Sequence, residues 1–187
     1  MGQERKAIRL TRLFGGIPVA VVSDDAKRDY CLSPGAEGVI HRRDFEHWGR
    51  LPDIDDEEGF ARWMKGARKF GEEFWRRLGG KRTPRIVFEH SGEDTIPTSV
   101  SLCDNAGMVV ACGGTRGYDA DVDLRFLWMR QKRFQGSHVA SLREFDSVTR
   151  LVAGGLLNPR PFATFTLGEA HPSLLENTGV EGNGQRW

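Results

Sequence analysis

Apolar residues along the chain alternate between helical spacing and short continuous runs. Residues 4–14 carry apolar side chains mostly three or four positions apart, and Gly15-Gly16 follows them, which predicts a first helix that ends there. Residues 17–22 form an almost continuous β-branched run, of the kind found in a strand that helices cover on both faces. The beginning of the sequence is therefore typical of a helix followed by a parallel strand.

The same alternation continues toward the C-terminus. An acidic stretch, residues 53–58, is typical of a helix N-terminus, and an apolar face with three- and four-residue steps runs from there to Gly79-Gly80. Similar patterns predict a short helix at 25–33, strands at 38–41, 85–89 and 108–112, a short helix between the last two, a helix at 142–157, a strand at 162–167 and a helix at 168–177. Strands that alternate with helices predict an α/β fold, a parallel sheet flanked by crossover helices.

Length and composition narrow the class of protein. We expect a single domain over residues 1–187, with a glycine-rich tail at 178–187. Lys and Arg number 27 and Asp and Glu 26, so no overall positive charge favours nucleic acid or an anionic membrane as a partner. The three cysteines lack metal or redox spacing, which predicts buried thiols and no metal site. Without a leader pattern or an apolar run of about 20 residues, we expect a soluble, cytoplasmic protein.

Several longer motifs are spread from about residue 7 to residue 177. They are Gly16-Ile17-Pro18-Val19-Ala20-Val21-Val22-Ser23, Arg43-Asp44-Phe45 with Trp48-Gly49-Arg50-Leu51-Pro52-Asp53, Val87-Phe88-Glu89-His90, Gly114-Thr115-Arg116-Gly117-Tyr118, Leu127-Trp128-Met129-Arg130-Gln131-Lys132-Arg133 and Gly136-Ser137-His138. In these motifs the sequence resembles crotonyl-CoA carboxylase/reductases, a branch of the medium-chain dehydrogenase/reductase superfamily that reduces enoyl-CoA with NADPH and captures CO2. The resemblance implies a Rossmann-like domain that binds NADP and an acyl-CoA or acyl-carrier thioester.

Two parts of the family pattern have no counterpart here. The family's dinucleotide domain begins with a strand and a glycine-rich turn that seats the pyrophosphate, and Met1 falls about where that turn should finish. We therefore expect a Rossmann-like sheet that lacks its usual first strand and turn, so that either the sheet closes up or another chain fills the gap. The family's return to its catalytic domain, at residues 177–184, is also missing. Apolar surface left uncovered in this way predicts a homo-oligomer or a complex with a complementary chain.

A candidate cofactor site follows the strand at 17–22. In an NAD-specific Rossmann fold a carboxylate at the position of Ser23 would bind the ribose, whereas a neutral Ser23 with Lys27 and Arg28 close behind suits the extra phosphate of NADP. Asp24 and Asp25 fit equally well with an ordinary solvated helix N-terminus that acids cap. Both interpretations stay open.

Two further groups lie where buried strands should end. The family resemblance makes Gly113, Gly114 and Thr115 the nicotinamide side of a cofactor site, and a plain tight turn is the alternative. Glu89 and His90 are candidates for proton transfer. Because neighbouring residues of a strand point to opposite faces, cofactor contact or loop structure is the favoured interpretation for this pair.

Two residues are assigned roles by the resemblance alone. His138 resembles the histidine of the family's CO2 pocket, and an imidazole there could act as acid, base or hydrogen-bond donor near neutral pH. Arg125 resembles a residue near the CoA nucleotide, and its guanidinium suits a phosphate. The alternatives are a structural histidine and a solvated basic face.

Three functional hypotheses follow. The first is a truncated carboxylase/reductase domain that binds NADPH or an acyl-CoA thioester and that a partner chain completes for enoyl-thioester reduction. The second is a non-catalytic module that binds an acyl thioester or a protein. The third is a repurposed acid/base enzyme that uses His138 without nicotinamide chemistry.

Overall fold

The computed structural model describes residues 3–159 and Thr166. Its internal contacts divide the chain into two units, Met1–Leu157 and Asn158–Trp187, and every helix and strand of the described part belongs to the first unit. Within this described part, no helix combines the length and the apolar character that crossing a bilayer would require.

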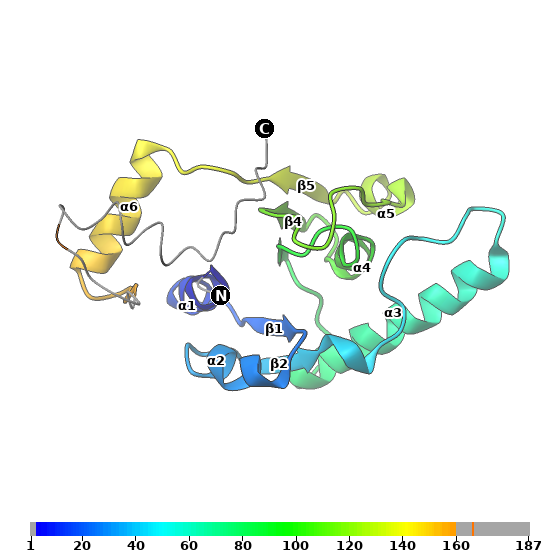
Figure 1. The fold of residues 1–187 in the computed structure, drawn as a ribbon, viewed down its shortest axis with the longest axis horizontal. Helices are drawn as coiled ribbons and strands as arrows, with labels where there is room; N and C mark the ends of the chain where they lie inside the picture. Colours follow the sequence, from blue (N-terminus) through cyan, green and yellow to red (C-terminus); the bar gives the residue numbers. More distant parts are fainter. Residues whose placement is uncertain (1–2, 160–165, 167–187) are drawn as a thin grey trace. The chain divides into compact units, whose positions relative to one another are not determined.

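Helices and strands alternate along the first unit (Figure 1). The helices are α1 (Gln3–Leu13), α2 (Arg28–Leu32), α3 (Glu57–Arg77), α4 (Ile96–Leu102), α5 (Leu124–Trp128) and α6 (Leu142–Ala153), with short 3-10 helices η1 (Asp25–Lys27) and η2 (Arg42–Asp44). The strands are β1 (Val19–Val22), β2 (Gly38–His41), β3 (Ile86–Glu89), β4 (Met108–Ala111) and β5 (Arg133–Gly136). The predicted α/β class is confirmed.

Most predicted boundaries agree with these elements to within a few residues. The helix predicted at 142–157 ends earlier, at Ala153, and the sequence patterns did not predict α5 or β5. The strand predicted at 162–167 and the helix predicted at 168–177 lie outside the described residues, apart from Thr166, which is in neither a helix nor a strand.

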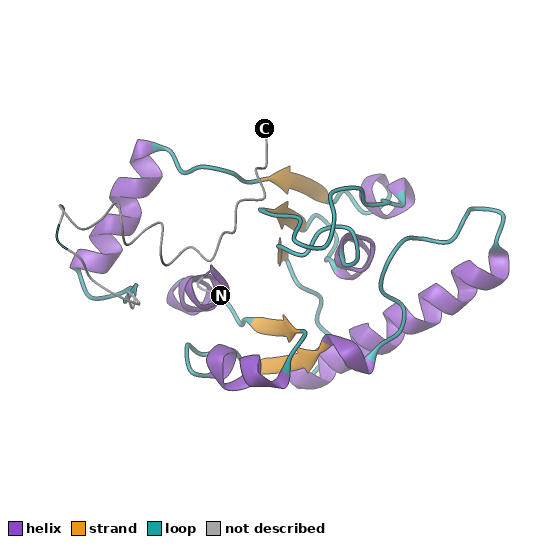
Figure 2. Cartoon of the chain, viewed as in Figure 1, coloured by secondary structure: helices purple, strands orange, loops and turns teal. Residues whose placement is uncertain are grey.

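The strands form two separate parallel sheets (Figure 2). In one sheet β1 pairs with β2, with Val19 opposite Gly38. In the other sheet the order is β3-β4-β5, with Met108 opposite both Ile86 and Arg133. No strand among the described residues pairs with the second edge of β1 or with the second edge of β3. Among the described residues the strands remain in two sheets and do not join into one.

The long helix α3 shows how local sequence sets the elements. Asp56 caps its N-terminus, because its side chain accepts a hydrogen bond of 2.8 Å from Gly59 N. Glu57 and Glu58 occupy the first turn and basic residues the last turn, an arrangement that the helix dipole favours at both ends. The predicted acidic start of this helix is therefore confirmed.

Three apolar clusters hold the two sheets and their helices. One joins α1 and α2 to β1 and β2 (Ile8, Val22, Cys31, Ala36 and Val39), a second joins β2 to α3 (Ile40, Phe70 and Phe74), and a third joins α4 to β4 (Ile96, Val100, Cys103 and Val109). Leu102 of α4 packs against the second cluster, so the two sheets are linked through α3 and α4. Burial raises the pKa of the Cys31 and Cys103 thiols, as expected for buried cysteines.

The prediction that apolar runs are covered on both faces is wrong for β1 and β3. Val21 of β1 is 45% exposed, and Ile86 and Phe88 of β3 are 68% and 45% exposed. In β3 the cause is that the α4 cluster packs on the side of Val87 and Val109, whereas Ile86 and Phe88 alternate with Val87 and point to the other side. Val21, Ile86 and Phe88 therefore each lie on a strand that has one edge unpaired among the described residues.

Candidate functional site

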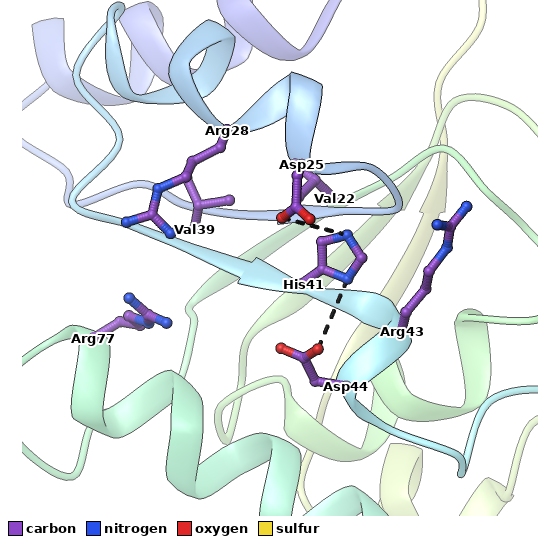
Figure 3. A pocket seen from close by; sticks show the side chains of 8 residues that line it. All are labelled: Val22, Asp25, Arg28, Val39, His41, Arg43, Asp44 and Arg77. Carbon is purple, nitrogen blue, oxygen red and sulfur yellow. Dashed lines mark ion pairs between the residues drawn. The ribbon is translucent and has the colours of Figure 1, made fainter.

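A hollow of about 330 Å³ opens beside β1 and β2 (Figure 3). Its lining consists of Val22, Asp25, Arg28, Val39, His41, Arg43, Asp44 and Arg77. The lining includes arginines from α2, η2 and α3, and Val22 and His41 are the last residues of their strands. Open α/β sheets bind ligands at the carboxyl ends of their strands, so the hollow lies where a ligand is expected.

Charged groups of both signs face this hollow. The His41 ring lies between two carboxylates, with Nε2 3.8 Å from Asp25 Oδ1 and Nδ1 3.9 Å from Asp44 Oδ1 (Figure 3). Arg77 is paired with Glu73, whose Oε1 lies 2.6 Å from Arg77 Nε.

The other two arginines of the hollow carry unneutralised charge. In the part of the chain that the structure describes, no carboxylate lies within ion-pair distance of Arg28 or Arg43. These two guanidinium groups are therefore the cations that remain available to an anionic ligand.

Of the predicted cofactor residues, Arg28 lines this hollow, and Ser23 and Lys27 lie beside each other in the segment between β1 and α2. Lys27 Nζ lies 3.5 Å from Ser23 Oγ, and Arg28 is part of the lining. The capping interpretation also holds locally, because the Asp24 side chain accepts a hydrogen bond of 3.0 Å from Ala26 N.

Sequence reasoning did not assign four polar residues of this hollow, His41, Arg43, Asp44 and Arg77, to the site. Arg43 follows directly after β2 and could have been found from that position, since parallel strands end at one edge of a sheet. His41 ends the same strand. Arg77, at the last turn of α3, carried no local signal for its place beside β2.

At the end of β3, Glu89 organises a closed turn. Its side chain is buried, and its carboxylate accepts hydrogen bonds from His90 N (3.0 Å), Ser91 N (2.9 Å), Gly92 N (3.4 Å), Thr95 Oγ1 (2.7 Å) and Ser99 Oγ (2.6 Å). The last two donors belong to the start of α4 and to its middle. A carboxylate with this many donors is held in place as an acceptor.

The predicted glycine motif lies against this turn. Thr115 N donates a hydrogen bond of 3.4 Å to His90 O. A Cβ atom on Gly113 would lie 3.3 Å from His90 O, and one on Gly114 would lie 2.8 Å from Gly117 O. The structure thus brings His90, Gly113, Gly114 and Thr115 together, and close packing of the chain explains why glycine occupies both positions.

His138 and Arg125 have different surroundings. His138 is exposed and follows β5, whose end is fixed beside β4 by a hydrogen bond of 2.8 Å from Ser137 N to Ala111 O. Arg125 pairs with Asp123 at 2.8 Å, which raises the pKa of Arg125, and its guanidinium carbon lies 5.4 Å from the Phe60 ring centre. His138 therefore shares the carboxyl edge of its sheet, whereas Arg125 is not part of the hollow beside β2.

No group of three or more His, Cys, Asp and Glu side chains that could hold a metal ion occurs within residues 3–159 or at Thr166.

Sequence comparison relates this chain to known enzymes. Residues 6–154 match the family described as zinc-binding dehydrogenase. A crotonyl-CoA carboxylase/reductase of Cereibacter sphaeroides is 39% identical over 95% of this chain, and a crotonyl-CoA reductase of Streptomyces collinus is 36% identical over 83% of it. The chain spans 42% and 33% of the lengths of these two relatives.

Solved structures agree with this relationship. The crotonyl-CoA carboxylase/reductase AntE in complex with NADP is 62% identical, with a TM-score of 0.81 over 83% of this chain and 38% of that chain. The 2-octenoyl-CoA carboxylase reductase CinF in complex with NADP and 2-octenoyl-CoA is 36% identical, with a TM-score of 0.72 over 89% of this chain and 36% of that chain. The Rossmann-like class of the fold is thereby confirmed.

Proposed function

Because the chain belongs to the zinc-binding dehydrogenase family, we propose that it is the nucleotide-binding part of a crotonyl-CoA carboxylase/reductase-type enzyme and binds NADP. The observation that carries this proposal is the hollow at the carboxyl ends of β1 and β2, in which neither Arg28 nor Arg43 has a carboxylate within ion-pair distance among the described residues. AntE and CinF resemble this chain, and the structures named above contain each of them in complex with NADP.

The residues present fit one end of NADP in particular. A 2′-phosphate offers acceptor oxygens that guanidinium forks bind well, and we assign that role to Arg28, with Lys27 next to it in the sequence, and to Arg43, which Figure 3 shows on the other side of the His41 ring. On the family resemblance we assign Gly113, Gly114 and Thr115, at the end of β4, to the nicotinamide side of the cofactor. When bound, NADPH supplies the hydride for reduction.

An acyl thioester and a partner chain complete the proposal. The relatives named above are enzymes of enoyl-CoA reduction or carboxylation by name, and we assign an acyl-CoA or acyl-carrier thioester to this chain on that basis. His138 is the candidate acid or base, and Arg125 the candidate contact to the thioester's nucleotide. No strand among the described residues pairs with the second edge of β1 or of β3, and these edges support completion by a second polypeptide, because an extended segment can add to an open sheet edge.

Titration calorimetry with NADPH, and with NADH as the comparison, tests cofactor binding. We expect NADPH to bind at least about tenfold more tightly than NADH, since one charge-assisted contact to the 2′-phosphate contributes that much. Arg28→Ala and Arg43→Ala should each weaken NADPH binding by about 10- to 100-fold and leave NADH unchanged. Arg82→Ala, an exposed arginine outside the hollow, is the matched control. Equal affinity for the two cofactors would contradict the phosphate site, and no binding of either would contradict the function.

A second function, a non-catalytic protein-binding module, is favoured by the unpaired edges alone. Light scattering tests the association that both functions imply, and NADPH binding then separates the two. We expect a dimer or larger assembly at high protein concentration, since exposed residues such as Ile86 and Phe88 favour association. A clean monomer that also fails to bind NADPH would leave neither function standing.

A further inference from the structure

A second cavity, of about 190 Å³, lies between α3 and α4 and is distinct from the hollow beside β2. Its lining consists of Met64, Ala67, Arg68, Gly71, Trp75, Thr83, Thr98, Ser101, Leu102, Phe126 and Arg130. These residues come from α3, α4, α5 and the segments beside them. None of the residues assigned above to the cofactor or the thioester contributes to this lining.

Two polar atoms in this lining are buried without a hydrogen bond. They are Trp75 Nε1 and Thr98 Oγ1, and neither has a partner among the residues that the structure describes. Thr98 as a whole is only 2% exposed. Leaving a buried donor or acceptor unpaired costs about 1–3 kcal/mol, so a ligand that pairs with these atoms would gain from them. An indole N–H can only donate, and the ligand must therefore present an acceptor.

Positive charge surrounds the same cavity. Arg68 and Arg130 are part of the lining, and Lys81 Nζ lies 5.1 Å from the centre of the Trp75 ring. Asp104 is a carboxylate that contacts this lining, because it accepts a hydrogen bond from Thr83, and its pKa is lowered by that bond and by other groups including Arg85. Asp104 is thus already engaged, and the cavity as a whole favours an anion.

The rest of the lining is apolar and sets the size of the ligand. Met64, Ala67, Leu102 and Phe126 offer hydrocarbon surface, and a cavity of this volume is slightly larger than one that holds benzene. An inorganic anion would leave that surface uncovered. We propose that the α3–α4 cavity binds a small carboxylate with an apolar body of about the size of benzoate, its carboxylate toward Trp75 and the two arginines.

Nuclear magnetic resonance of the indole N–H groups tests the proposal directly. The chain has five tryptophans, and the Trp75→Phe variant identifies the Trp75 signal by its disappearance. Titration of the whole chain with sodium benzoate should shift that signal saturably, with a dissociation constant of about 1 mM, as expected from the free energy per atom of small ligands. Benzyl alcohol and sodium acetate are the uncharged and the non-aromatic comparisons, and both should bind at least about fivefold more weakly.

Three variants separate the contributions. Ala67→Phe fills the cavity and should abolish the shift, and Thr98→Val removes the hydroxyl at constant shape and should weaken binding about threefold to tenfold. Arg68→Gln combined with Arg130→Gln should weaken benzoate binding about fivefold, since exposed charges contribute modestly. Lys69→Gln, also exposed on α3 but outside the lining, is the matched control.

The outcomes are decisive because folding is read from the same spectrum. Retention of the other indole signals shows that each variant is folded. A Trp75 signal that does not saturate with benzoate, an equal response to benzyl alcohol, or an unchanged response in folded Thr98→Val and in the double arginine variant would each overturn the proposal. NADPH binding involves none of these residues, so its failure and the failure of this proposal are distinguishable.

Discussion

The connections that follow β2 and β3 each bury a polar side chain, and they do so in opposite ways. After β3, the Glu89 carboxylate accepts hydrogen bonds from five donors. After β2, His47 is 8% exposed, and neither of its ring nitrogens has a hydrogen-bond partner within the residues described. The His47 ring instead lies among aromatic rings, with centroids 4.5 Å from Trp48 and 5.9 Å from Phe70.

This difference shows two ways in which a fold can tolerate a buried polar group. Glu89 keeps its acceptor capacity and is surrounded by donors, whereas His47 must remain uncharged, because burial lowers its pKa to about 4. The two connections also contact each other. Arg42 Nη2 lies 3.1 Å from Asp94 Oδ2, and Gly49 N donates a hydrogen bond of 2.9 Å to Asp94 O. The partnered turn thus helps to hold the unpartnered segment.

The largest effect is expected from Glu89→Ala. Removing the carboxylate leaves several donors around the turn without an acceptor at once, and we expect the free energy of unfolding to fall by about 3–5 kcal/mol. Urea unfolding at neutral pH measures this, with Glu72→Ala, an exposed carboxylate on α3, as the control. A loss below about 1 kcal/mol would mean that the turn does not depend on Glu89, and its assignment to proton transfer would regain weight.

The next effect concerns pH. The pKa of His47 in the folded state, about 4, lies below the ordinary value of 6.5, so the folded state binds this proton less readily than the unfolded chain does. The stability that uncharged His47 contributes is therefore fully present above about pH 6.5. It is lost as the pH falls to about 4, which lowers the free energy of unfolding by about 3 kcal/mol. His47→Phe should remove this part of the acid sensitivity. Parallel pH curves for wild type and His47→Phe would refute the argument.

The smallest effect tests the link between the two connections. Asp94→Ala and Arg42→Ala should each lower the free energy of unfolding by about 1–2 kcal/mol, and a double-mutant cycle should give a coupling energy of about 1 kcal/mol, because the two side chains share one ion pair. Arg116, which also contacts Asp94, explains why the two single losses need not be equal. Additive losses would show that the two connections are independent.

The fold could be predicted well where sequence patterns are local. The β-branched run before Ser23 and the capped aromatic face of α3 each determine their own element. The exposure of Ile86 and Phe88 could not be predicted, because an apolar run does not specify what covers it. The strand β5, with the sequence Arg-Phe-Gln-Gly, has neither a clear alternation nor a buried run, so local patterns gave no signal for it.

The candidate site could be predicted only in part for the same reason. Ser23, Lys27 and Arg28 follow one strand directly, and sequence position was enough to group them. Arg77 reaches the same hollow from the end of a long helix, and only the packing of α3 against β2 brings it there. Glu89 was singled out as a candidate from its position at the end of β3. Its hydrogen-bond donors Thr95 and Ser99 could not be predicted, because they reach the carboxylate only when α4 packs against β3.

The edges of β1 and β3 that are unpaired in the described part also affect the susceptibility of this chain to aggregation and proteolysis. A strand edge with unused N–H and C=O groups is a template on which strands from other molecules can add, and natural proteins usually protect such edges. Among the described residues both outer edges of each sheet are unpaired, and exposed apolar residues lie on β1 and β3. Production of this chain alone should therefore favour aggregates and proteolysis, and its abundance in a cell would be set by how quickly something covers those edges.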